Sequence, residues 1–155
     1  EVQALRERRA PHPASTLAAR AADIDRIFAL PTVGEIVGTL EGEGGAGSAW
    51  ARETAATLRK RSPLMLHVVL EQVRRARAMS LADDLRMERD MVRRCFTLRP
   101  GAAGETVEGI RALAVDKDHA PRWNPARIED VTPDMVGVFF QSPWPAHAHP
   151  LRDLA

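Results

Sequence analysis

Hydrophobic residues recur along this chain mainly at intervals of three and four positions, which is the spacing of one face of an α-helix. One such segment covers residues 17–30, and Pro31 predicts its end. A second begins at Thr32 and Glu35, which have the spacing of a capping box. Both segments are therefore predicted to be helices with one buried face. The apolar stripe of the second consists of Val33, Ile36, Val37 and Leu40.

The segment 63–79 is the most apolar of the predicted helices. It follows Ser62, an N-cap residue, and starts with Pro63, which is favoured at the first position of a helix. Its first half contains the run LMLHVVL, and this breadth predicts burial on more than one side. His67 lies inside the run, where we expect a packed, hydrogen-bonded side chain; a ligand or acid-base role is the alternative.

The next helix is predicted to start at Ser80, with Asp83 in the capping position, and to end near Leu98. Mixed charges separate its apolar positions and indicate a solvated or interfacial face. The lone cysteine, Cys95, excludes an internal disulfide, and we expect a buried thiol because no histidine lies nearby in sequence to activate it. The predicted apolar stripe consists of Leu81, Leu85, Val92 and Phe96, and Cys95 is expected on the same stripe as Val92 and Phe96.

A shorter helix is predicted over residues 106–115, with Val107, Ile110 and Ala114 on one side. The charged turn Asp116-Lys117-Asp118 closes it. A last short helix is predicted to start at Thr132-Pro133. Few segments alternate as strands do, so the chain as a whole is predicted to be all-α.

Composition narrows the classes of function. A net charge of +1 over 155 residues gives no electrostatic case for nucleic acid, and no apolar run approaches the ~20 residues that a membrane span needs. We therefore expect neither nucleic acid nor a membrane as a partner. The expected location is the cytoplasm, or the mitochondrial matrix in a eukaryote. The scarcity of strands and the absence of a first methionine predict the helical part of a larger protein.

Two further patterns give no site. The glycine-rich run Gly42–Ser48 follows a helix and lacks the Lys-Ser/Thr pair of a phosphate-binding loop, so a flexible connector is predicted. His147 and His149 are two positions apart without a third ligand nearby, and we expect no metal site there.

The order of motifs in the second half resembles a known family. Glu108-Gly109-Ile110-Arg111-Ala112 is followed by Asp116-Lys117-Asp118, then by Pro121-x-Trp123-x-Pro125, then by Val131-Thr132. This order, over roughly residues 20–142, resembles the C-terminal half of 3-hydroxyisobutyryl-CoA hydrolases. These belong to the enoyl-CoA hydratase/isomerase (crotonase) superfamily.

The resemblance implies the C-terminal helical region of an α/β crotonase-fold enzyme whose ββα core is missing here. Residues 1–20 would be a linker and short helix from that core, residues 21–142 the helical region, and residues 143–155 an irregular tail. The parent enzyme would cleave the thioester of 3-hydroxyisobutyryl-CoA in valine breakdown. The part given by this chain is expected to be inactive alone.

The role of this helical region would be to cap the acyl pocket and to support contacts in a homo-oligomer. No cofactor is expected beyond the coenzyme A of the substrate. Alternatives are an enoyl-CoA hydratase or isomerase of the same fold, and a non-catalytic helical interaction module.

The resemblance places no catalytic residue in this chain. Crotonase enzymes polarise a thioester carbonyl with two backbone N–H groups and handle water with an acidic side chain, all from the missing core. One binding role carries over: a lysine at the position of Lys117 approaches the nucleotide end of coenzyme A in related hydratases. The alternative is that Asp116 and Asp118 pair with Lys117 and hold the turn. Trp123 is expected to be a packing anchor rather than a substrate platform.

Overall fold

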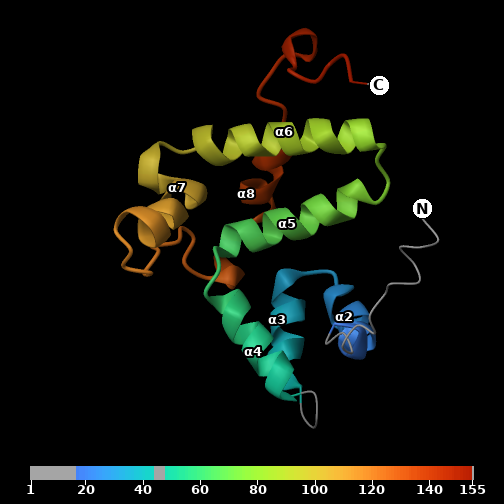
Figure 1. Ribbon diagram of the computed structural model, residues 1–155, viewed down its shortest axis with the longest axis vertical. Helices are drawn as coiled ribbons and strands as arrows, with labels where there is room; N and C mark the ends of the chain where they lie inside the picture. Colours follow the sequence, from blue (N-terminus) through green and yellow to red (C-terminus); the bar gives the residue numbers. More distant parts are fainter. Residues whose placement is uncertain (1–16, 44–47, 155) are drawn as a thin grey trace, which may run out of the picture.

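The computed structural model describes residues 17–43 and 48–154, and within these ranges all regular structure is helical (Figure 1). The all-α prediction is confirmed for this part of the chain. Residues 44–47 of the predicted glycine-rich connector and residues 1–16 of the predicted linker lie outside the described ranges. No helix in the described ranges is both long and apolar enough to cross a membrane. Short 3-10 turns occupy Ala18–Arg20, Gly101–Ala103, Ile128–Asp130, Val138–Phe140 and Ala146–Ala148.

Three N-terminal helices form one core cluster: α2 (Ala21–Phe28), α3 (Val33–Gly42) and α4 (Ser48–Arg59). The predicted capping box is confirmed at α3, where Thr32 Oγ1 accepts the Glu35 amide at 3.1 Å. All four residues of the predicted apolar stripe of α3 are buried. The cluster consists of Ile27, Ile36, Leu40, Ala51 and Ala55.

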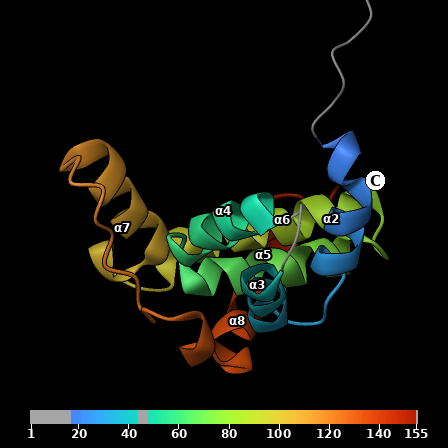
Figure 2. The same ribbon diagram turned by 90° about the horizontal axis from the view of Figure 1, so that it is seen from below.

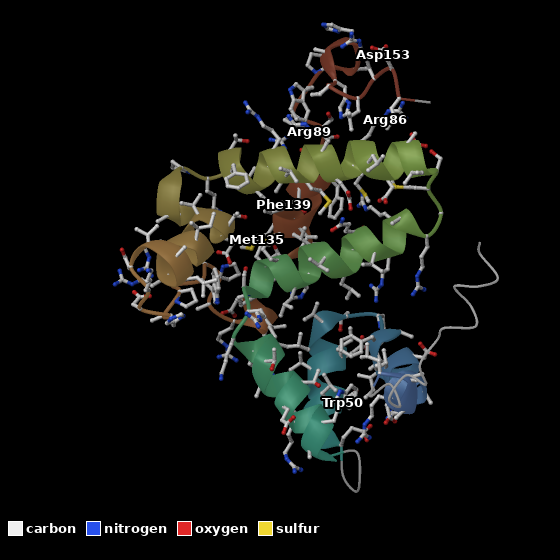
Figure 3. All side chains as sticks on the ribbon, in the orientation of Figure 1. Trp50, Arg86, Arg89, Met135, Phe139 and Asp153 are labelled. Carbon is white, nitrogen blue, oxygen red and sulfur yellow. The ribbon has the colours of Figure 1, made fainter. Side chains whose placement is uncertain are left out.

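The centre of the molecule is an antiparallel pair, α5 (Pro63–Ala76) and α6 (Leu81–Thr97), which lie side by side in Figure 1. Seen from below (Figure 2), α8 (Pro133–Gly137) lies on one side of this pair, near α3. Figure 3 shows Met135 and Phe139 between the two long helices. The predicted two-sided burial of α5 is confirmed, because Leu64 and Val68 belong to this core while Leu66 and Leu70 pack towards α3.

The predicted apolar stripe of α6 is not the buried one. Val92 and Phe96 are 51% and 52% exposed, whereas Met87 and Met91 are buried against α5 and the α8 region. The helix carries two apolar stripes, and the position of the 3-10 turn Val138–Phe140, which follows α8, decides which one is covered. Cys95, predicted on the same stripe as Val92 and Phe96, lies instead on the methionine side. It is half-buried, and burial raises the pKa of its thiol.

The segment after α6 also buries a different face from the one predicted. Helix α7 (Glu105–Ile110) continues into a π-helix at Arg111–Val115. Ile110 is 46% exposed, whereas Glu105 and Glu108 are buried. The two glutamates are buried in place of the apolar residues because each carboxylate has hydrogen-bond partners inside the fold, and these bonds offset the cost of burial.

The C-terminal segment 143–154 lies against α6 (Figures 1 and 3). Arg86 donates to the carbonyls of Leu151 at 3.1 Å and Arg152 at 3.4 Å. His149 is buried, with Nε2 3.1 Å from Asp90 and Nδ1 accepting the Leu151 amide at 3.0 Å. Both ring nitrogens of His149 therefore have protein partners.

Candidate functional site

Helix α7 is fixed to its surroundings by the buried carboxylate of Glu105. One oxygen accepts the hydroxyl of Ser62, the residue that also caps α5 through the Met65 amide at 3.2 Å. The other oxygen accepts the Asn124 amide at 2.9 Å. One side chain thus joins the start of α5, the start of α7 and the loop after the π-helix.

Glu108, one turn further along α7, holds the same loop at a second point. Its carboxylate accepts two bonds from Arg111, both at 2.8 Å, and the Arg122 amide at 2.7 Å. The Arg111 side chain and then the Arg122 amide lower the pKa of Glu108 to about 2. The carboxylate is therefore ionised at neutral pH, with every bond favouring the charged form.

The lowered pKa of Glu108 predicts a specific acid sensitivity. Its folded-state value of about 2 lies below its ordinary value of 4.5, so its stabilisation is present above pH 4.5 and is lost as pH falls towards 2. We expect Glu108→Gln to be less stable than wild type at pH 7, and the difference to shrink between pH 4.5 and 2. Urea midpoints across this range measure it; a difference independent of pH would contradict the assignment.

Lys117 lies in the turn that Arg111 organises. The Arg111 guanidinium contacts Asp116 at 2.6 Å and Asp118 at 2.8 Å, so both aspartates flanking Lys117 are held by the arginine. The Lys117 side chain is exposed, and no ion pair of Lys117 is found within the described ranges. In this structure the two aspartates pair with Arg111 instead of with Lys117. The ammonium remains available to an external anion.

A groove of about 700 Å³ lies between the start of α5 and the α7–π-helix segment. Its walls are mainly apolar, including Val69, Ile110 and Leu113, and basic Lys60 and Arg61 also line it. It can accept an apolar or amphipathic group, with cations close to it.

Trp123 forms part of the groove wall as a packed side chain. Its indole N–H donates to the Lys60 carbonyl at 3.2 Å. A Cβ at Gly109 would lie 3.3 Å from its ring, so a residue without a side chain permits this contact. The contacts are those of the packing anchor that the sequence predicts.

The other candidate residues do not assemble into a site. The Nδ1 of His67 lies 2.9 Å from the Pro63 carbonyl of its own helix, which agrees with the hydrogen-bonded role expected. In the ranges that the structure covers, no three potential metal-binding side chains come together. The glutamates and Arg111 were not predicted as a network, although the i, i+3 spacing of Glu108 and Arg111 was a usable signal.

Comparison with known proteins defines the class. The sequence pattern of the enoyl-CoA hydratase/isomerase family matches residues 2–140, and the chain belongs to this family. It is 37% identical over 119 residues to 3-hydroxyisobutyryl-CoA hydrolase 1 of Arabidopsis thaliana, covering 76% of this chain and 31% of the relative. It is 38% identical over 118 residues to the small ribosomal subunit protein mS47 of Arabidopsis thaliana, covering 76% and 28%.

A solved structure agrees with this assignment. The crystal structure of a carnitinyl-CoA dehydratase from Mycobacterium thermoresistibile superposes with a TM-score of 0.75 and 34% identity. The match covers 93% of this chain and 39% of the dehydratase. The chain therefore spans less than half of that structure and under a third of the two relatives above.

Proposed function

We propose that this chain is the C-terminal helical part of an acyl-CoA hydrolase that cleaves the thioester of 3-hydroxyisobutyryl-CoA. In that reaction water adds to the thioester carbonyl, the C–S bond breaks, and the products are the free acid and the thiol of coenzyme A. The similarity to a hydrolase of that name, and the order of motifs from Glu108 to Thr132, support the assignment. The catalytic groups would come from the preceding ββα core.

The observation that carries the binding part of the proposal, a contact with coenzyme A, is the exposed ammonium of Lys117. It is exposed, its two acidic neighbours are bound to Arg111, and the turn stands next to a groove lined by apolar and basic residues. A lysine ammonium is a compact charge suited to phosphate. We propose that it contacts the nucleotide end of coenzyme A.

The exposed apolar residues of the long helices support the covering role. Val69 and Val73 on α5, with Val92 and Phe96 on α6, are all about half exposed. Ile110 and Leu113 are also exposed on the α7–π-helix segment, and they line one groove together with Val69. Such surfaces in a folded protein commonly mark contacts with another domain or subunit. We propose that they cap the acyl pocket of the core and support subunit contacts in a homo-oligomer.

Substitution of Lys117 tests the binding role. In the full-length protein, Lys117→Ala should raise KM for the acyl-CoA roughly tenfold and leave kcat unchanged, because a charge-assisted contact remote from the thioester is lost. The same variant should show no change with the acyl-pantetheine thioester, which lacks the nucleotide. An unchanged KM for the acyl-CoA would show that Lys117 does not contact the ligand.

Two other functions are distinguished by product analysis. An enoyl-CoA hydratase of the same fold would hydrate a double bond and release no thiol, and the family that the chain belongs to includes that activity in its description. A non-catalytic helical module is favoured by the similarity to mS47, which carries the name of a ribosomal protein. Release of free thiol from 3-hydroxyisobutyryl-CoA by the full-length protein supports hydrolysis. Hydration of an enoyl-CoA without release of thiol supports the hydratase. No turnover of either of these two thioesters supports the module.

A further inference from the structure

Arg111 is the hub of the turn that carries Lys117. Its guanidinium contacts the Glu108 carboxylate twice at 2.8 Å, Asp116 at 2.6 Å and Asp118 at 2.8 Å. It also donates to the Ala120 carbonyl at 3.2 Å. One planar group with several donors thus joins a helix residue to three positions of the following turn, which a single ammonium could not do.

The turn needs such a hub because its backbone is unusual. Lys117 and His119 have φ angles of 57° and 54°, in the left-handed region that residues with a side chain rarely adopt. Two backbone bonds also hold the turn: the Asp116 amide donates to the Arg111 carbonyl at 2.8 Å, and the His119 amide donates to the Ala112 carbonyl at 3.0 Å. A conformation of this kind persists only where surrounding contacts enforce it.

Arg111 also controls the charge around Lys117. Without it, the side chains of Asp116 and Asp118 on either side would be free to contact the ammonium. The Ala120 amide, which donates to the Asp118 carboxylate, and then the Arg111 side chain lower the pKa of Asp118, so this neighbour stays charged. Arg122 is the other cation that acts on Glu108 and Asp118. With both arginines present, the carboxylates of Glu108, Asp116 and Asp118 have cationic neighbours other than Lys117. The lysine therefore remains without an ion-pair partner in the described ranges.

We propose that Arg111 is a positioning residue for coenzyme A binding: it fixes the 116–120 turn and occupies its aspartates so that the Lys117 ammonium faces the nucleotide phosphates. This role rests on the proposed contact between Lys117 and the nucleotide end of the substrate. Arg111 itself touches no ligand. Its effect therefore passes entirely through Lys117.

The test compares two substrates in the full-length protein, the 3-hydroxyisobutyryl thioesters of coenzyme A and of pantetheine. Arg111→Met should raise KM for the coenzyme A thioester about tenfold, as loss of the Lys117 contact would. KM for the pantetheine thioester and kcat for both should stay at the wild-type values. The double variant Arg111→Met/Lys117→Ala should have the KM of Lys117→Ala alone, because the two residues act as one unit.

Arg111→Lys is a second variant that tests the same role if Arg111→Met fails to fold. It keeps the charge but cannot reach three carboxylates at once, so we expect a rise in the same KM of about threefold with the fold retained. The matched control is Arg59→Met. Arg59 similarly bridges two acidic residues, Glu41 at 2.9 Å and Glu129 at 2.7 Å, away from the turn. It should leave both KM values unchanged.

The outcomes separate the two proposals. If Lys117→Ala changes neither KM, the lysine contact is wrong and the positioning role falls with it. If Lys117→Ala has its effect while both Arg111 variants behave as wild type, only the positioning role is overturned. Equal rises for the two thioesters, a fall in kcat, or additive effects in the double variant would assign Arg111 a general structural role and overturn the proposal.

Discussion

Phe139→Ala should lower the free energy of unfolding of the full-length protein by about 3–5 kcal/mol, the usual cost of deleting a buried aromatic side chain. Phe139 is 4% exposed and fills the space between α5 and α6 (Figure 3). It packs in one cluster with Leu64, Val68 and the two buried methionines of α6. Its removal leaves a cavity that three separate helical segments would have to close. Urea denaturation measures the change, and a loss below about 1 kcal/mol would contradict this packing.

Phe96→Ala is the comparison for that experiment. Phe96 is 52% exposed in this chain, so the same deletion should cost under about 1 kcal/mol if the side chain also faces solvent in the full-length protein. A cost close to that of Phe139→Ala would show that another part of the protein, or a second subunit, covers α6. The pair of variants therefore examines the core and the proposed covering role together.

Glu105→Ala should be the second most damaging change, with a loss of about 2–4 kcal/mol, because it removes a buried carboxylate and leaves its hydrogen-bond partners without their acceptor. Those partners are the Ser62 hydroxyl and the Asn124 amide, on segments far apart in the sequence. We expect amide hydrogen exchange at Asn124 to accelerate strongly. Unchanged protection of this amide would show that Glu105 does not hold the loop.

Glu88→Ala is the matched control for Glu105. Glu88 is an exposed glutamate whose carboxylate accepts a single side-chain bond from Gln72, at 3.1 Å. Because the carboxylate and its partner both remain accessible to water, its removal should change the free energy of unfolding by no more than about 0.5 kcal/mol. A loss comparable with that of Glu105→Ala would mean that burial is not the cause.

Helix starts were the features most directly predictable from the sequence. Thr32, Ser62, Ser80 and Thr132 each accept the amide three residues later, as their positions before an apolar run predict. A cap depends on residues adjacent in the chain, so it can be identified without knowing the fold. The same holds for the buried stripe of α3, whose helix has only one apolar face.

Tertiary structure decided the buried faces of α6 and α7. On α6 the sequence offers two apolar stripes, and only the position of Phe139 determines that Met87 and Met91 are covered while Val92 and Phe96 are not. On α7 the buried residues are charged, and their burial depends on partners at Ser62, Arg122 and Asn124 that sequence spacing does not reveal. Burial of a carboxylate is stable only where such partners converge.

The turn around Lys117 shows the same division. The sequence by itself determined the family, through the order of motifs from Glu108 onward, and the resemblance to that family raised Lys117 as a candidate for binding. It did not show whether Asp116 and Asp118 hold that lysine. The fold decided this, because the π-helix and two left-handed residues bring both carboxylates to Arg111. Neighbours in sequence compete for partners in space, and only the backbone path selects between them.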